Sequence, residues 1–327
     1  MAEGVTSAFS IFNADEVNLI SERTKVGRSS RDWLMRQLEG FPSKEESFPR
    51  LYDGMHIRYG SFARNTKIRP LDDIDLIITF AADGTSYSSI GYGNTYVLSV
   101  PQSATNLRKL CNEYDQLNSI KVVNKIVKAL SNIEHYKSAD IHRKQEAATL
   151  QLSSYEWNFD IVPALYTDTG HYLIPDGNGN WKATDPRIDQ KRTRDTNSLH
   201  NGNALQLIRT LKFWNEYAQM PTMGSYLFET ILINYLNTRQ PITSFSTYEL
   251  WCFWSHLKTA VYNSCTDPKG FQGELNTLSY DDKNKISAKA GEAYEKSYNA
   301  IMLAKDEPEK AINKWREIFG GNFPKFG

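Results

Sequence analysis

The sequence has few cysteines, no excess of either charge and no long apolar run, and each absence narrows what the protein can be. Its 327 residues include three cysteines, an odd number without CxxC spacing. This pattern predicts neither a disulfide framework nor a zinc site, and it favours a reducing compartment. No apolar stretch approaches the roughly 20 residues of a membrane-spanning helix. The N-terminus also lacks the pattern of a signal peptide, so we expect a cytoplasmic protein.

The charges of the chain balance. Lysine plus arginine and aspartate plus glutamate each number 38, which gives a formal net charge of zero. Proteins that grip long nucleic acids usually carry an excess of positive charge, because neutralisation of phosphates dominates their affinity. The balance therefore argues against a long nucleic acid as the main ligand, although it leaves room for a local basic pocket.

Hydrophobic patterns divide the chain into a mixed first part and a helical second part. Apolar residues recur at helical spacing over residues 104–134, within a region that otherwise alternates strands and helices. Residues 171–195 are rich in Gly, Asn, Asp and Pro, which predicts a long surface loop and a boundary. We expect a catalytic core over residues 1–185, with an N-terminal helix that braces both lobes. A helical nucleotide-binding domain is expected over residues 186–327, with a cleft between the two.

The stretch DIDLIITF, residues 73–80, places two acids on one face of an otherwise apolar strand. Because side chains alternate along a strand, Asp73 and Asp75 point the same way, while the apolar residues between them point into a core. Two like charges this close repel each other unless a proton or a cation holds them. Mg²⁺ usually takes one or two carboxylates together with substrate phosphates, so the pair predicts a metal site. Asp72 precedes the strand and is expected in a loop.

A third acid stands inside a second apolar strand, WNFDIVPALY. Phe159 and Ile161 share one face of this strand and Asp160 lies on the other, where a buried acid is costly unless it has a partner. If the two strands are neighbours, Asp160 joins the first two acids. Three carboxylates can hold two metal ions about 3.5–4 Å apart, which stabilise both oxygens of a phosphoryl transfer. We therefore expect two Mg²⁺ ions as cofactors, replaceable by Mn²⁺.

The residues RYGS, shortly before the first acidic strand, predict a turn that binds an anion. Gly60 would allow a phosphate to approach the backbone closely, and the hydroxyl of Ser61 would donate a further hydrogen bond. A short helix that begins at Ser61 would present its N–H groups to the same anion. The turn and the acids together predict a site for a nucleoside triphosphate and its metal ions.

The order of these motifs resembles the polymerase-β-like nucleotidyltransferases: Gly-Ser, eleven residues, Asp-Ile-Asp, and then a distant Asp on a strand. The stretches NALQLIRTLKFWNEY and MGSYLFETILINYL resemble the helical domain of 2′–5′ oligoadenylate synthetases, cGAS and the bacterial cGAS/DncV-like nucleotidyltransferases. YLIPDGNGNWKATDP and WREIFGGNFPKFG favour the bacterial branch. The resemblance implies an α+β fold, in which a polymerase-β-like core with a mixed sheet precedes an all-helical oligoadenylate-synthetase-like domain.

The resemblance also implies three binding residues in the second half. Lys212 matches a family lysine that contacts the donor triphosphate, and Ser225 matches a serine that binds the phosphates. Tyr226 matches an aromatic residue that stacks on a nucleobase, a contact that tolerates any base. Without the family, Lys212 is as readily a solvated helix residue, and Tyr226 is as readily a core residue.

The function implied by the resemblance is the synthesis of a second messenger. NTPs, either ATP or GTP or both, with pyrimidine NTPs as further candidates, would be joined into a cyclic di- or trinucleotide with release of pyrophosphate. The product would activate a downstream effector in antiphage signalling of the CBASS type. In some bacterial relatives a ubiquitin-transferase-like partner conjugates the C-terminal residue to other proteins, and Gly327 is the candidate here.

Two other functions stay open from the residues alone. A template-independent RNA-tailing or CCA-adding nucleotidyltransferase shares the acids but needs a surface for an RNA 3′ end. A nucleotide-binding pseudoenzyme would bind NTPs without turnover. The neutral charge counts against the first function, and the intact acids count against the second.

Overall fold

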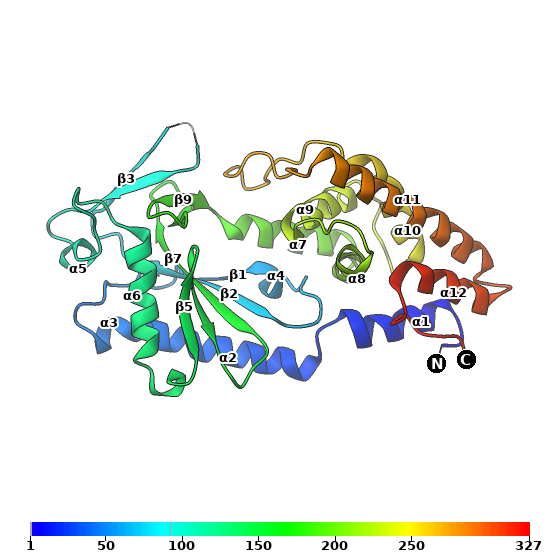
Figure 1. Cartoon of the computed structure of the whole chain (residues 1–327), viewed down its shortest axis with the longest axis horizontal. Helices are drawn as coiled ribbons and strands as arrows, with labels where there is room; N and C mark the ends of the chain where they lie inside the picture. Colours follow the sequence, from blue (N-terminus) through cyan, green and yellow to red (C-terminus); the bar gives the residue numbers. More distant parts are fainter. Residues whose placement is uncertain (1, 92) are drawn as a thin grey trace. The chain divides into compact units, whose positions relative to one another are not determined.

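The computed structural model describes residues 2–91 and 93–327, and the chain divides into two compact units (Figure 1). The sheet unit comprises Ser21–Arg64 and Leu71–Gln190. The helical unit comprises Met1–Ile20, Asn65–Pro70 and Lys191–Gly327. The expected division was a single boundary at residue 185. The observed division differs, because the first twenty residues and a short internal segment, residues 65–70, group with the helical unit.

The sheet unit is built on a mixed sheet with the strand order β1-β2-β7-β8-β9-β4-β3, and β5 joins through β6 to β7. This is the predicted α+β core with a mixed sheet. The strands are β1 (Ile57–Tyr59), β2 (Asp73–Phe80), β3 (Ser86–Ser89), β4 (Tyr96–Ser99), β5 (Asp140–Lys144), β6 (Ala147–Gln151), β7 (Asn158–Tyr166), β8 (Tyr172–Pro175) and β9 (Trp181–Thr184).

The two strands that carry the acids are parallel neighbours. β2 pairs with β7 over its whole length, in a register that places Asp73 beside Asn158 and Asp75 beside Asp160. The side chains of Ile74 and Leu76, on the opposite face, are completely or almost completely buried. The condition under which Asp160 joins the first two acids, that the two apolar strands are neighbours, is therefore met.

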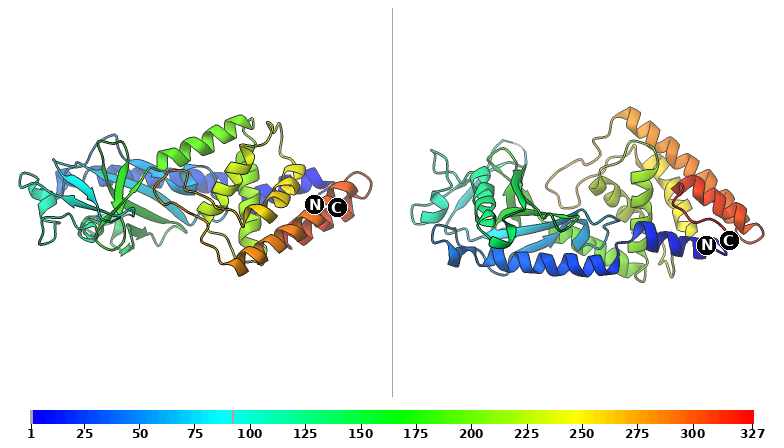
Figure 2. Two further views of the ribbon diagram at one scale, coloured as in Figure 1. Left: turned by 90° about the horizontal axis from the view of Figure 1, so that it is seen from above. Right: turned by 60° about the horizontal axis from the view of Figure 1, so that its bottom comes forward.

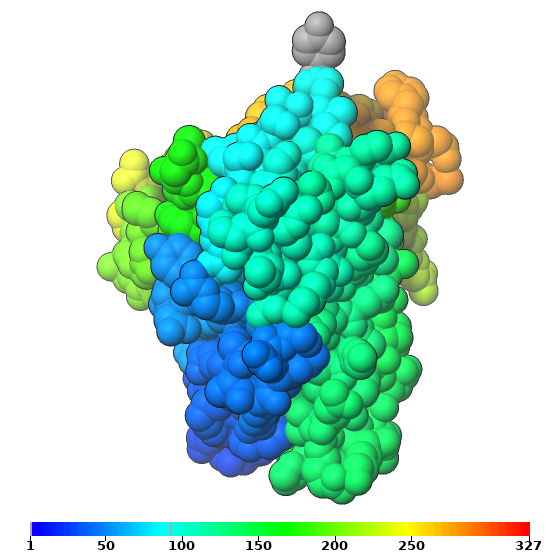
Figure 3. All heavy atoms as spheres, turned by 90° about the vertical axis from the view of Figure 1, so that its left-hand side faces the viewer, coloured from blue at the N-terminus to red at the C-terminus, as the bar shows by residue number. Residues whose placement is uncertain are grey.

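Two helices of the sheet unit, α2 (Ser21–Glu39) and α6 (Ser119–Ser131), belong to the scaffold that supports this sheet. α2 approaches closely at Gly27, where a Cβ would lie 2.9 Å from Leu71 Cδ2 and 3.5 Å from Ile74 Cδ1. Figure 3 shows the α2–α3 segment beside the segment that contains α6, on one face of this unit. The shorter helices of the unit are α3 (Phe41–Lys44), α4 (Gly60–Ala63), α5 (Thr105–Arg108) and the 3₁₀ helix η2 (Glu134–Tyr136).

The helix predicted over residues 104–134 is wrong in its first half. The structure has the single turn α5 and then an irregular segment, and α6 begins only at Ser119. Asp115 in this segment adopts a positive φ of 59°, which a helix does not allow. Asn118 then caps α6, because its side chain accepts a hydrogen bond of 3.1 Å from the N–H of Lys121.

The loop predicted over residues 171–195 is also wrong. This stretch forms the hairpin of β8 and β9 and most of α7 (Pro186–Leu199). Its Gly and Asn residues make a tight turn, in which Gly177 and Gly179 have positive φ. The Asp176 carboxylate accepts hydrogen bonds from the N–H groups of Asn178 and Asn180. The Gly, Asn and Asp residues do form a turn, as their composition indicates, but this turn connects two strands and is not part of a long loop.

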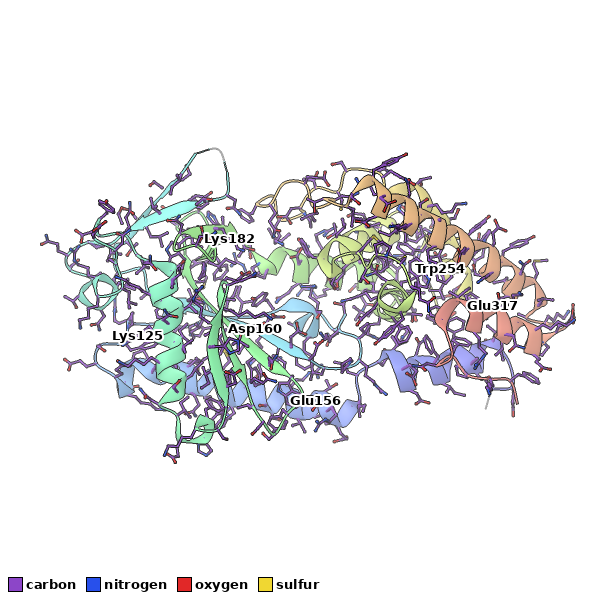
Figure 4. All side chains as sticks on the ribbon, in the orientation of Figure 1. Lys125, Glu156, Asp160, Lys182, Trp254 and Glu317 are labelled. Carbon is purple, nitrogen blue, oxygen red and sulfur yellow. The ribbon has the colours of Figure 1, made fainter. Side chains whose placement is uncertain are left out.

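Helices around an aromatic core make up the helical unit. Trp214, Trp254, Trp315, Phe9 and Phe12 are all at most 1% exposed. Figure 4 labels Trp254 among the helices of this unit. The helices are α1 (Val5–Phe12), the π-helix η1 (Asn13–Val17), α8 (Ala204–Tyr217), α9 (Ser225–Leu236), α10 (Thr247–Ala260), α11 (Tyr280–Leu303) and α12 (Pro308–Phe319), with the last part of α7.

The two chain ends meet within the helical unit. Ala2 and Phe326 form a parallel bridge, and the N–H of Gly327 donates to the carbonyl of Ala2 at 3.3 Å. Figure 2 shows both ends side by side. No helix in the described part of the chain is both long and apolar enough to cross a membrane.

Replacement of Trp254 by alanine should destabilise the helical unit more than any surface change. Its ring lies 5.7 Å from that of Trp214 and 6.3 Å from that of Trp315. Loss of a fully buried aromatic side chain costs about 3–5 kcal/mol. We expect this loss in urea denaturation followed by far-UV circular dichroism.

The control for this variant is Tyr280→Ala, since Tyr280 is 74% exposed. Its stability should stay within about 0.5 kcal/mol of the wild type. Equal losses for the two variants would contradict the assignment of Trp254 to the core.

Candidate active site

The predicted acids gather on one face of the sheet unit. In a parallel pair, residues in register lie about 4.7–4.9 Å apart between the strands, and their side chains share a face. Asp75 and Asp160 stand in this relation, and Asp73 lies two residues before Asp75 on the same face. All three are partly buried. Figure 4 labels Asp160 on β7 within this unit.

The acidic face becomes apolar further along the same strands. Ile77 and Val162 follow Asp75 and Asp160 at a spacing of two, and both are about 1% exposed. They pack in a small cluster with Ile57, Ala147, Ala164 and Tyr172. The acids therefore stand at the border of a dry patch, where charges interact more strongly than they do in water.

The Gly-Ser turn lies directly against one of the acids. β1 ends at Tyr59, and the short helix α4 begins at Gly60 and includes Ser61. Gly60 has a φ of +74°, and a Cβ at this position would lie only 1.7 Å from Asp75 Oδ2. No other residue type fits here without moving the carboxylate. The predicted phosphate turn and the predicted metal ligands are therefore one constellation.

Two further side chains in this constellation were not predicted. Thr149 on β6 stands opposite Asp160, and its Oγ1 donates a hydrogen bond of 2.7 Å to Asp160 Oδ1. Tyr59 stands opposite Asp75 on β1. Burial, together with the charge of Asp75 and other nearby carboxylates, raises the pKa of the Tyr59 phenol well above its ordinary value. The phenol therefore stays protonated beside the acids.

Carboxylate oxygens are the donor type that Mg²⁺ prefers. Within residues 2–91 and 93–327, no group of three or more His, Cys, Asp and Glu side chains is arranged to hold a metal ion. Asp75 and Asp160 nevertheless stand in register, and the backbone at Gly60 leaves room for the Asp75 carboxylate. A site of one or two carboxylates, completed by substrate phosphates and water, fits Mg²⁺ better than a closed protein cage does. The residues present therefore fit this ion.

The predicted triphosphate lysine lies in the helical unit, where it is paired. Lys212 on α8 and Glu229 on α9 form an ion pair with 3.3 Å between Nζ and Oε2, and their side chains are 8% and 4% exposed. The hydroxyl of Thr66 donates to the same Oε2 at 3.0 Å. Lys212 is therefore not the solvated helix residue that the sequence alone allowed.

Ser225 and Tyr226 also belong to the helical unit, at the start of α9. Ser225 is exposed and Tyr226 is partly buried. The Tyr226 hydroxyl donates to Asp267 Oδ1 at 2.8 Å, and Lys269 Nζ donates to the Tyr226 oxygen at 2.7 Å. The Lys269 ammonium also lies 3.9 Å from the centre of the tyrosine ring. Tyr226 is therefore neither a plain core residue nor an isolated ring.

Asp267 anchors the loop that supports Tyr226. Burial alone would raise the pKa of this carboxylate, but hydrogen bonds from Tyr226 and from the N–H of Lys269 hold the pKa below its ordinary value. Its other oxygen accepts from the N–H groups of Phe271 and Gln272. The loop is thus organised around one buried anion.

A known domain family matches part of the chain. Residues 98–197 match the Second Messenger Oligonucleotide or Dinucleotide Synthetase (SMODS) domain. This stretch includes Asp160 and Thr149. It does not include the Gly-Ser turn or the first two acids, so the match covers only part of the candidate site.

Curated proteins and solved structures extend the similarity over the whole chain. A probable cyclic nucleotide synthase of Bacillus cereus strain VD146 is 46% identical over 99% of both chains. A cyclic AMP-AMP-GMP synthase of Enterobacter hormaechei subsp. hoffmannii strain UCI 50 is 24% identical over 80% of this chain and 72% of its own. The structure of CdnC from E. coli MS115-1 with ATP superposes with a TM-score of 0.71, at 18% identity, over 97% of this chain and 98% of that one.

Replacement of Gly60 by alanine should disturb the site through Asp75. The positive φ costs an alanine about 1–2 kcal/mol, and the added methyl would overlap the carboxylate. We expect Gly60→Ala to lower the melting temperature and the stability more than backbone strain alone explains.

Gly54→Ala is the matched control. Gly54 has a φ of +78°, and no atom lies within 4 Å of the place that a Cβ would take, so the variant carries the strain without the overlap. Equal melting temperatures for Gly60→Ala and Gly54→Ala would refute the close approach of Gly60 to Asp75.

Proposed function

This chain belongs to the family of bacterial cGAS/DncV-like nucleotidyltransferases, and from that premise we propose that it joins NTPs into a cyclic di- or trinucleotide messenger. It is a nucleotidyltransferase, and its relatives are named as a probable cyclic nucleotide synthase and a cyclic AMP-AMP-GMP synthase. The observation that carries the proposal for this chain is the register of Asp75 with Asp160, with Gly60 against the Asp75 carboxylate.

Following the resemblance, we assign the metal ligands to the three acids on the sheet, of which Asp75 and Asp160 stand in register. Asp73 and Asp75 would hold two Mg²⁺ ions and Asp160 would share one of them. Such ions neutralise charge on transferring phosphates and on the leaving pyrophosphate. Asp160 also accepts the hydrogen bond of Thr149, which orients its carboxylate toward the acceptor hydroxyl. Tyr59 remains a neutral hydrogen-bond donor beside these acids.

The donor nucleotide would be held through its phosphates. The backbone at Gly60 and the hydroxyl of Ser61 serve a triphosphate, because a turn without a side chain lets phosphate oxygens reach N–H groups. Lys212 and Ser225 would add charge and a hydroxyl, and Tyr226 would stack on a base. These three assignments come from the family resemblance, and the exposure of Ser225 is compatible with its role.

In the reaction, a ribose hydroxyl of one nucleotide attacks the α-phosphorus of another. The new P–O bond forms as the bond to pyrophosphate breaks, and the hydroxyl proton leaves toward Asp160. A further transfer closes the ring. We propose ATP as one substrate, since one of the solved structures similar to this chain was determined with ATP and the Enterobacter relative is named for a product that contains AMP.

We further propose that the cyclic product acts as a second messenger for an effector in CBASS-type antiphage defence. Conjugation of Gly327 by a ubiquitin-transferase-like partner stays a prediction of the resemblance. Gly327 is exposed, and its N–H donates to the carbonyl of Ala2.

Loss of the paired acids should abolish cyclic product. The wild-type protein with all four rNTPs and Mg²⁺ should yield phosphatase-resistant oligonucleotides, identified by mass spectrometry together with their bases and ring size. Asp73→Ala combined with Asp75→Ala should reduce the yield by at least about 100-fold, as loss of positioned charge stabilisation does.

Asp72→Asn is the matched control for this double variant. Asp72 is the adjacent acid, it lies before β2 and it is exposed, so its loss should leave most of the activity. If the protein extends an added RNA 3′ end and makes no cyclic product, the proposed messenger synthesis is wrong and the RNA-tailing function is supported. Nucleotide binding without any turnover would favour the pseudoenzyme.

Removal of divalent ions tests the assigned metal dependence. Excess EDTA should stop turnover, and Mg²⁺ or Mn²⁺ should restore it, because the clustered carboxylates and the phosphates need a neutralising cation. Unchanged synthesis in EDTA would refute the metal assignment of Asp73, Asp75 and Asp160.

A further inference from the structure

A buried network in the helical unit ties Lys212 to the segment that joins the phosphate turn to the acidic strand. This segment, residues 65–70, is here called the connector. It leaves α4, belongs to the helical unit, and then returns to the sheet unit, where β2 begins at Asp73. In the sequence, Ser61 therefore lies shortly before the connector and Asp73 shortly after it.

Specific contacts hold the connector in the helical unit. The carbonyl of Asn65 accepts from Arg209 Nη1 at 2.8 Å, and Thr66 is completely buried. Ile68 is 6% exposed and packs in the helical core. The guanidinium of Arg69 donates to the carbonyls of Ala14 and Asn18, at 3.0 and 3.1 Å. These contacts attach the connector to the helices of its own unit.

Glu229 stands at the centre of this arrangement. Its Oε2 accepts from Lys212 Nζ at 3.3 Å and from Thr66 Oγ1 at 3.0 Å, so one oxygen joins α8, α9 and the connector. Both side chains of the ion pair are over nine-tenths buried. A buried charge that loses its partner is strongly disfavoured, so the ammonium of Lys212 stays where the carboxylate holds it.

We propose that Glu229 is a positioning residue, which sets the place of the Lys212 ammonium and, through Thr66, the place of the connector. The proposal rests on the function proposed above for Lys212, and it adds that this lysine and the ends of the connector are adjusted by one shared carboxylate. An ammonium has three N–H donors, so Lys212 can keep Glu229 as a partner while it binds a phosphate. Glu229 itself touches no substrate.

Glu229→Gln separates charge from shape. The amide oxygen can still accept from Thr66, but the negative charge that holds Lys212 is lost. We expect the dissociation constant of ATP, measured by calorimetry, and the apparent KM for ATP to rise about ten-fold, with kcat changed by less than about three-fold. This is the pattern of an interaction lost equally from the ground state and the transition state. Glu249→Gln is the matched control, because Glu249 pairs with Arg239 at 3.0 Å elsewhere in the same unit.

A double-mutant cycle tests whether the two residues act as one unit. Lys212→Met combined with Glu229→Gln should bind ATP no more weakly than Lys212→Met alone, because Glu229 acts through the lysine. Losses that simply multiply, or an ATP affinity of Glu229→Gln equal to that of Glu249→Gln, would overturn the proposal.

If Glu229→Gln fails to fold, the connector side of the network still decides. Thr66→Val removes the hydroxyl and should lower kcat about ten-fold, whereas Thr66→Ser retains the donor and should restore the wild-type rate. Equal behaviour of the two variants would refute the proposal. A wild-type protein that binds ATP but makes no cyclic product would instead refute the proposed function, and the calorimetric comparison would still test Glu229.

Discussion

The site depends on the parallel pairing of β2 with β7. This register places Asp75 beside Asp160 and, through the antiparallel neighbours on either side, brings Tyr59 and Thr149 to the same acids. A shift of β2 by one residue would send Asp73 and Asp75 to the opposite face, where Ile74 and Leu76 are buried. The apolar face thus fixes the register, and the register in turn assembles the charges. One face of this strand pair therefore contributes buried core contacts, and the other face contributes the acids of the site.

Much of this site could be predicted from the sequence, because strand alternation is a local property. An acid on the partly exposed face of an apolar strand is unusual, and that signal identified Asp73, Asp75 and Asp160. The same reasoning applies to Glu229, an isolated acid in the apolar helix SYLFETILINYL, whose burial needed a partner. Thr149 and Tyr59 gave no such signal, since threonine and tyrosine are ordinary strand residues and only cross-strand pairing shows their role.

The errors in the predicted elements also have physical causes. Apolar spacing continued across residues 109–118, but α5 ends at Arg108, Asp115 in the segment that follows is left-handed, and α6 begins only after the capping Asn118. Turn residues between residues 171 and 195 predicted a loop, although two short strands around a tight turn use the same composition. In both places Asn and Asp side chains accept hydrogen bonds from the backbone, and hydrophobic patterns do not record these bonds.

The connector has a consequence for how this chain can be divided. Neither unit is a continuous stretch of sequence, because the chain passes from helical to sheet unit after Ile20, back at Asn65, again to the sheet at Leu71 and finally to the helices at Lys191. A fragment cut near residue 185 would keep Phe9, Phe12 and Ile68 but lose the helices that bury them. The two units are therefore interleaved in the sequence, so no single cut of the chain separates one from the other.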